Sequence, residues 1–193
     1  MGKGRLEAFS DGVLAIIITI MVLEMKVPHS ADPGALRPLV PVLLSYALSF
    51  VFIGIYWNNH HHMFQAAGTV NGRVLWANLH LLFWLSLVPF ATGWMGENHF
   101  APLPVALYGA VLLMAGVAYF ILAQVLVRHH GAESRLAMAV GESRKEMISL
   151  ALYALAIAIS FANHWIALGL YVVVAMIWFI PDRRIENAVS PGA

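Results

Sequence analysis

Four polar residues mark the first apolar segment of this chain. In the stretch RLEAFSDGVLAIIITIMVLEMKVP, residues 5–28, Arg5, Ser10 and Asp11 precede the apolar run and Thr19 interrupts it. A charge near a membrane interior costs about 3 kcal/mol or more unless it is paired or hydrated, so Asp11 needs hydrogen-bond donors. A threonine hydroxyl can bond back to its own helix or offer its oxygen to an ion.

Two later segments carry donors for Asp11. They are YWNNHHH, residues 56–62, and WANLH, residues 76–80, and both are expected at the depth of Asp11. The candidate partners are Trp57, Asn58, His61, Asn78 and His80. We therefore expect Asp11 to lock the first helix to the second and third. A proton-handling or ion-binding role for Asp11 is the alternative.

A helix over residues 9–27 would collect one stripe of side chains. At 100° per residue an arc of about 100°, the width of one helix face, holds the following residues: Gly12, Ile16, Thr19, Ile20, Leu23 and Val27. Asp11 falls about 140° from Ile16 on the same wheel, so it faces different surroundings. Such a stripe is typical of ordinary helix packing, and a pore wall is the alternative that spacing alone leaves open.

The composition indicates which elements position these residues. Of 193 residues 61% are hydrophobic and 11% are charged, against about a quarter charged in a soluble domain. The mean hydropathy is +0.77. We therefore predict an all-α membrane protein with a single six-helix transmembrane domain over residues 1–193. The expected spans are approximately 9–27, 39–57, 74–95, 103–127, 147–163 and 165–180.

The last two spans and the connection before them differ from the other predicted segments. The last two segments are shorter than the roughly 20 residues that a membrane helix needs, and only a few residues separate them. We expect them to form a tight helical hairpin. The polar connection 128–146 is predicted to be a cytoplasmic loop with a short surface helix, in which His129 and His130 are solvated.

The distribution of Lys and Arg predicts the orientation. With both termini cytoplasmic, all but two of the 11 Lys and Arg residues lie inside, and only Lys26 and Arg37 lie outside. The inside set is Lys3, Arg5, Arg73, Arg128, Arg135, Arg144, Lys145, Arg183 and Arg184. The expected location is the plasma or inner membrane, as a multi-pass protein.

Several other classes of function are disfavoured. The chain has no cysteine, and its net charge of +1 gives no sign of nucleic-acid binding. Three consecutive histidines, residues 60–62, point in three directions on a helix, so we expect hydrogen bonds there and no metal site. We find no nucleophile–base pair, so an enzyme and a cofactor are not expected. A proton-coupled or cation secondary transporter is the main alternative, but charges are missing from the interiors of the last three spans.

The residues Arg5, Phe9, Ser10 and Asp11 fit the pattern R-x-x-x-F-S-D. This pattern, at the start of the first of six spans, resembles the signature of the lysosomal transmembrane potassium channel family. A chain with one six-helix repeat is similar to the bacterial members, which are homotetramers. The resemblance implies a pore lined by the first helix of each subunit, with no carbonyl filter loop.

The resemblance also assigns roles to the stripe on the first helix. It implies a hydrophobic constriction at Ile16, further apolar layers at Ile20 and Leu23, and a part for Thr19 in selectivity. An apolar ring gates by excluding water and favours the cation that loses its hydration more easily, so we expect weak selectivity for K⁺ as the permeant ion. The motif residues Arg5 and Asp11 look like structural links to the second and third helices.

Overall fold

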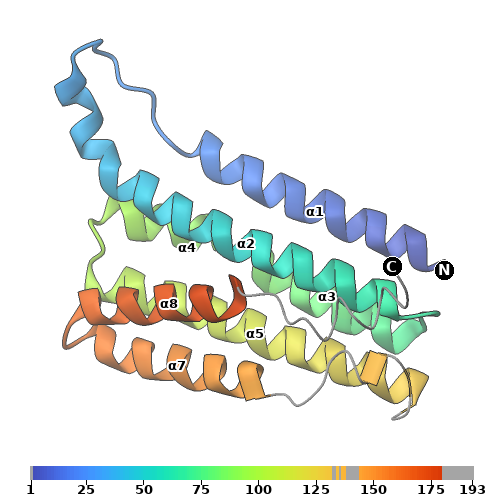
Figure 1. The fold of residues 1–193 in the computed structure, drawn as a ribbon. Helices are drawn as coiled ribbons and strands as arrows, with labels where there is room; N and C mark the ends of the chain where they lie inside the picture. The colour runs from blue at the N-terminus through green and yellow to red at the C-terminus, as the bar shows by residue number, and fades with distance from the viewer. Residues whose placement is uncertain (1, 132–133, 135, 138–143, 180–193) are drawn as a thin grey trace, which may run out of the picture.

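The computed structural model describes residues 2–131, 134, 136–137 and 144–179, and within these residues it contains helices and turns but no strand. The helices lie alongside one another in a bundle, with α1 along one edge (Figure 1). Their bounds are α1 Lys3–Leu23, η1 Pro33–Leu39, α2 Val40–Ala66, α3 Gly72–Ser86, α4 Val88–Glu97, α5 Pro102–His130, α7 Arg144–Ser160 and α8 His164–Phe179. The predicted all-helical membrane fold is confirmed.

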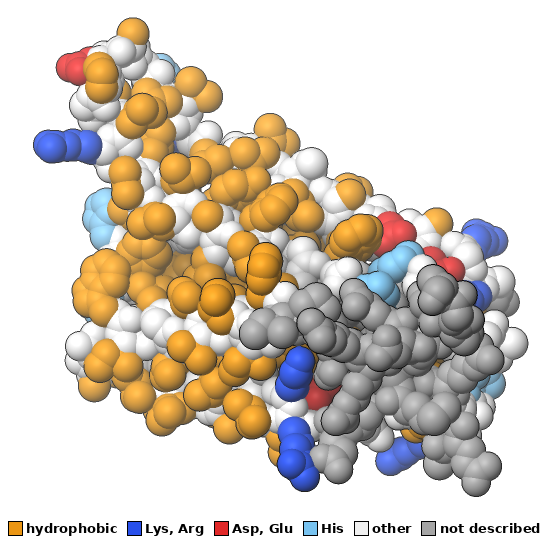
Figure 2. All heavy atoms as spheres, in the orientation of Figure 1, with side chains coloured by type: hydrophobic (Ala, Val, Ile, Leu, Met, Phe, Trp, Pro, Cys, Tyr) orange, Lys and Arg blue, Asp and Glu red, His pale blue; other side chains and the backbone are white. Residues whose placement is uncertain are grey.

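Four segments are long and apolar enough to cross a membrane. They are Lys3–Leu23, Pro33–Ala66, Gly72–Glu97 and Pro102–His130. The helices α7 and α8 have 17 and 16 residues and pack against each other as a hairpin joined by a short turn. Hydrophobic side chains cover much of the exposed flank of the bundle, as expected for a surface in contact with lipid (Figure 2).

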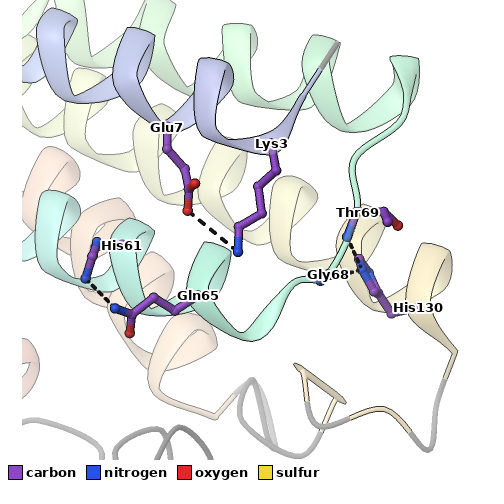
Figure 3. Close-up of polar contacts among 7 residues, drawn as sticks. All are labelled: Lys3, Glu7, His61, Gln65, Gly68, Thr69 and His130. Carbon is purple, nitrogen blue, oxygen red and sulfur yellow. Dashed lines mark hydrogen bonds and ion pairs between the residues drawn. The ribbon is translucent and has the colours of Figure 1, made fainter.

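The first helix differs from the predicted span 9–27 at both ends. It begins at Lys3, so the polar entrance is helical, and a Lys3–Glu7 ion pair of 3.9 Å joins its first two turns (Figure 3). It ends at Leu23, and Glu24 is its C-cap. The wheel position of Val27 was therefore wrong, because Val27 lies beyond the last helical turn.

The second helix is longer than the predicted span 39–57. Helix α2 continues to Ala66, because the polar residues after Trp57 are not helix breakers. The three consecutive histidines therefore lie inside the helix and point in different directions. The predicted span ended with the apolar residues, and the helix itself continues through the polar residues that follow them.

The third predicted span, 74–95, is interrupted. Helix α3 ends at Ser86 and α4 begins at Val88, and Pro89 lies in the first turn of α4. Proline lacks an N–H, so it cannot bond to the Leu85 carbonyl, and its ring crowds that carbonyl. The break was readable from the sequence but was not predicted.

The last three helices, α5, α7 and α8, pack closely on one another. Fully buried Tyr108 and Tyr171 contact each other edge to face, and the Tyr171 hydroxyl donates to the Val105 carbonyl at 3.1 Å. A methyl group added at Gly109 would overlap the Tyr171 hydroxyl, so a glycine there permits the close approach of α8 to α5. Of the predicted loop 128–146, residues 128–130 belong to α5 and residues 144–146 to α7, while residues 132–133, 135 and 138–143, where a surface helix was expected, lie outside the described residues.

Candidate functional site

One face of α1 packs on the rest of the bundle, against α2, α3 and α4. Its buried side chains are Leu6, Ser10, Leu14, Ile17 and Met21. At 100° per residue they fall within an arc of about 80° with Ser10 at its centre. This face, about 120° from the stripe that contains Ile16, fixes the rotation of the helix about its axis.

Ser10 is part of a buried chain of hydrogen bonds across three helices. Its hydroxyl donates to the Leu6 carbonyl at 2.9 Å and accepts from Asn78 Nδ2 of α3 at 3.0 Å. Asn78 Oδ1 lies 2.8 Å from His60 Nε2 of α2. All three side chains are at most 2% exposed. Buried polar groups are costly unless they are bonded, so this chain specifies how α1 sits on α2 and α3.

Asp11 has one of the expected partners. The Trp57 indole of α2 donates to Asp11 Oδ1 at 3.0 Å, and this bond is exposed in the single chain. Of the other candidates, Asn78 bonds to Ser10, His61 Nε2 lies 2.8 Å from Gln65 Nε2, and His80 accepts from Trp84. The structure gives no hydrogen bond for Asn58 within the described residues. The buried lock therefore centres on Ser10, and Asp11 lies beside it.

The remaining motif residues do not enter the core. Phe9 is 52% exposed, and Arg5 is exposed. Within the described part of the chain Arg5 forms no ion pair. Among the described residues no ion pair or side-chain hydrogen bond joins Arg5 to the second or third helix, and the link implied by the family resemblance stays a prediction.

The stripe predicted as a pore wall is exposed on the single chain. Ile16 is 58%, Ile20 40% and Leu23 79% exposed, and Thr19 lies among them. These residues are on a helix that crosses the membrane and that has already buried another face. A row of apolar side chains on such a helix can face lipid or a second copy of the chain.

Thr19 bonds to its own helix. Its hydroxyl donates to the Ile16 carbonyl at 2.9 Å, three residues earlier. That bond uses the single hydroxyl proton and leaves oxygen lone pairs for another partner. An intrahelical bond and an ion-facing oxygen are therefore compatible, because a cation binds lone pairs.

A groove lies beside the stripe. It has a volume of about 560 Å³ and runs between α1, α2 and α4, with Ile16 and Ile20 on its wall. Its lining includes the carboxylates Glu24 and Glu97 and contains no Lys or Arg. Lys26 pairs with Glu97 at 3.0 Å but does not line the groove. The potential in such a groove favours cations over anions.

Several histidines of this structure form hydrogen bonds at different places in the bundle. Among the described residues no group of three or more His, Asp or Glu side chains could hold a metal ion. The expectation that His129 and His130 lie in a loop was wrong, because they are the last residues of α5; His129 is exposed, His130 is partly exposed, and both bond to residues 68–71. The sequence analysis did not predict these hydrogen bonds, because the partner segment lies some 60 residues away in the sequence.

Three comparisons place the chain among known proteins. The family model described as "Endosomal/lysosomal potassium channel TMEM175" matches residues 5–89. A protein described as a potassium channel from Chryseobacterium sp. (strain P1-3) is 58% identical over 98% of this chain and 99% of its own length. Another, from Chamaesiphon minutus, is 31% identical over 90% of this chain and 91% of its own length.

A solved structure is also similar over nearly the whole chain. It is the crystal structure of a lysosomal potassium-selective channel TMEM175 homolog from Chamaesiphon minutus. It superimposes with a TM-score of 0.80 at 29% sequence identity. The match covers 92% of this chain and 96% of that one.

Proposed function

Because the chain belongs to the TMEM175 family of potassium channels, we propose that it is a multi-pass membrane channel that passes K⁺ along α1. The observation that carries this proposal is the face of α1 that contains Ile16, Ile20 and Leu23. It is apolar and exposed, while another face of the same helix is anchored by a buried hydrogen-bond chain.

Copies of the chain complete the pore in this proposal. We propose a homotetramer in which the stripe of each α1 faces the common axis. An Ile16 side chain from each subunit forms the narrowest ring, and Ile20 and Leu23 add apolar layers above it. Such a ring stops conduction when it is narrow enough to exclude water. Ion preference then comes from the cost of dehydration and from the Thr19 oxygens, which gives weak selectivity for K⁺.

The proposed orientation has the N-terminus in the cytoplasm. One end of the bundle carries the start of α1, the α2–α3 connection and the end of α5, and the start of α7 is directed toward that end (Figure 1). These segments contain Lys3, Arg5, Arg73, Arg128, Arg144 and Lys145. The positive-inside rule supports a cytoplasmic position for this end, in the plasma or inner membrane. Arg135, Arg183 and Arg184 lie outside the described residues.

A flux assay tests the channel. The purified protein is placed in liposomes, and the fluxes of K⁺ and Na⁺ are measured under equal gradients. We expect K⁺ to move faster than Na⁺, with no flux in protein-free vesicles. An absence of K⁺ flux would contradict the proposal. A flux that requires an opposing proton gradient would identify a secondary transporter instead.

Thr19→Val is expected to weaken the preference for K⁺. The substitution keeps the shape of the side chain and removes the oxygen whose lone pairs are free in the structure. In bilayers with K⁺ on one side and Na⁺ on the other, the reversal potential should move towards zero. A loss of about 1 kcal/mol of discrimination corresponds to a roughly fivefold lower permeability ratio. An unchanged reversal potential would make Thr19 a packing residue.

A further inference from the structure

The end of α5 binds the connection between α2 and α3 through His130. The backbone N–H groups of Gly68 and Thr69 donate to His130 Nε2 at 3.1 and 3.2 Å, as Figure 3 shows. Both partners are donors, so Nε2 must carry no proton. His130 Nδ1 lies 3.0 Å from the Leu126 carbonyl, which accepts the remaining ring proton. The imidazole is therefore held neutral with its proton on Nδ1.

His129 binds the same connection in the opposite tautomer. Asn71 Oδ1 accepts from the Val74 backbone N–H at 3.0 Å, which fixes the orientation of the Asn71 amide. Asn71 Nδ2 then donates to His129 Nδ1 at 3.0 Å, so Nδ1 carries no proton. His129 Nε2 keeps the proton and donates to Thr69 Oγ1 at 3.1 Å. His130 can thus accept from Gly68 and Thr69, and His129 from Asn71, only while the two imidazoles are neutral.

We propose that His129 and His130 form a proton-sensing clamp that releases the α2–α3 connection when the pH at this end of the bundle falls. Protonation of His130 would point an Nε2–H at two N–H groups. Protonation of His129 would point an Nδ1–H at the Asn71 amide N–H. Each uptake of a proton converts an attractive contact into a repulsive one, which is how histidine switches work.

The clamp acts on the two helices that seat α1. The connection that it holds joins α2, which carries His60, to α3, which carries Asn78, and these side chains form the buried chain to Ser10. Release of residues 68–71 would free the ends of both helices at this side of the membrane. The clamp is a property of the fold and does not depend on the proposed ion conduction.

Other charged and titratable side chains lie on the elements that surround the clamp. On the elements beside the clamp the charged or titratable side chains are Arg128, Arg73, Arg144, Lys145, Glu146, His60, His61, His62 and His80. The arginines and the lysine keep their charge between pH 5.5 and 7.5. His61 on α2 is exposed and provides a control histidine, because it bonds to Gln65 and not to the connection.

Hydrogen exchange of the full chain in nanodiscs tests the clamp directly, because the Gly68 and Thr69 amides are its donors. Protection factors of a peptide that covers residues 65–72 are compared at pH 7.5 and 5.5, after correction for the intrinsic exchange rate. The clamp closes only on a neutral imidazole, and the neutral fraction of an ordinary histidine side chain falls about tenfold between these two pH values. We expect the protection of these amides to fall by about the same factor in the wild type.

Two variants identify the histidine responsible. His130→Gln offers an uncharged oxygen at the position of Nε2, so the Gly68 and Thr69 amides should lose less protection between pH 7.5 and 5.5 than in the wild type, and only the part that His129 controls. His61→Gln should lose protection as the wild type does. The proposal is overturned if the wild type keeps its protection at pH 5.5, or if His130→Gln loses it to the same extent. The wild-type result decides the question even if His130→Gln does not fold.

Discussion

The Ile16→Asn channel is expected to conduct more K⁺ than the wild type and to discriminate less against Na⁺. Ile16 lies at the centre of the exposed stripe on α1 and is 58% exposed in the single chain. In the proposed homotetramer an asparagine ring would hold water where isoleucine excludes it. A barrier lower by on the order of 1 kcal/mol gives about a fivefold larger conductance. Single-channel recordings in bilayers measure both quantities.

Val22→Asn is the matched control for this experiment. Val22 is also exposed on α1 but falls about 120° from Ile16 on the wheel, off the proposed pore face. It should leave conductance and the K⁺/Na⁺ permeability ratio close to those of the wild type. If Ile16→Asn changes neither quantity, or if both variants have the same effect, Ile16 does not form the constriction.

Asn78→Leu is expected to lower the stability of the protein. Leucine has a similar size but leaves His60 Nε2 without its partner and Ser10 without its donor, in a site where both are buried. A buried polar group left unsatisfied costs about 1–3 kcal/mol. The variant should therefore melt at a lower temperature in detergent. Its oligomer fraction in gel filtration should also fall, since α1 would lose its fixed rotation.

Trp57→Phe distinguishes the buried chain from the exposed motif contact. It removes the indole that donates to Asp11 but keeps an aromatic ring, and this hydrogen bond is exposed. Exposed hydrogen bonds contribute less, so the change in unfolding free energy should stay below about 1 kcal/mol. A Trp57→Phe variant less stable than Asn78→Leu would show that Asp11, and not Ser10, holds α1 in place.

The sequence by itself determined the membrane class and the candidate pore face. Apolar segments separated by prolines and polar connections predicted the helices, because lipid requires long stretches without unpaired polar groups. The 3.6-residue repeat placed Ile16, Thr19, Ile20 and Leu23 on one side of α1, and the structure leaves that side exposed. The break between α3 and α4 also has a local cause, Pro89, but the sequence analysis predicted one continuous span there.

The tertiary structure decided which polar residue of α1 is buried. Periodicity sets the angle between Ser10 and Asp11 but leaves the rotation of the helix about its axis undetermined. That rotation depends on how Leu14, Ile17 and Met21 pack against other helices, and it turns Ser10 inwards and Asp11 to the surface. The clamp at His129 and His130 needs the same information, because its partners are distant in sequence and only the packing of α3 on α5 brings them together.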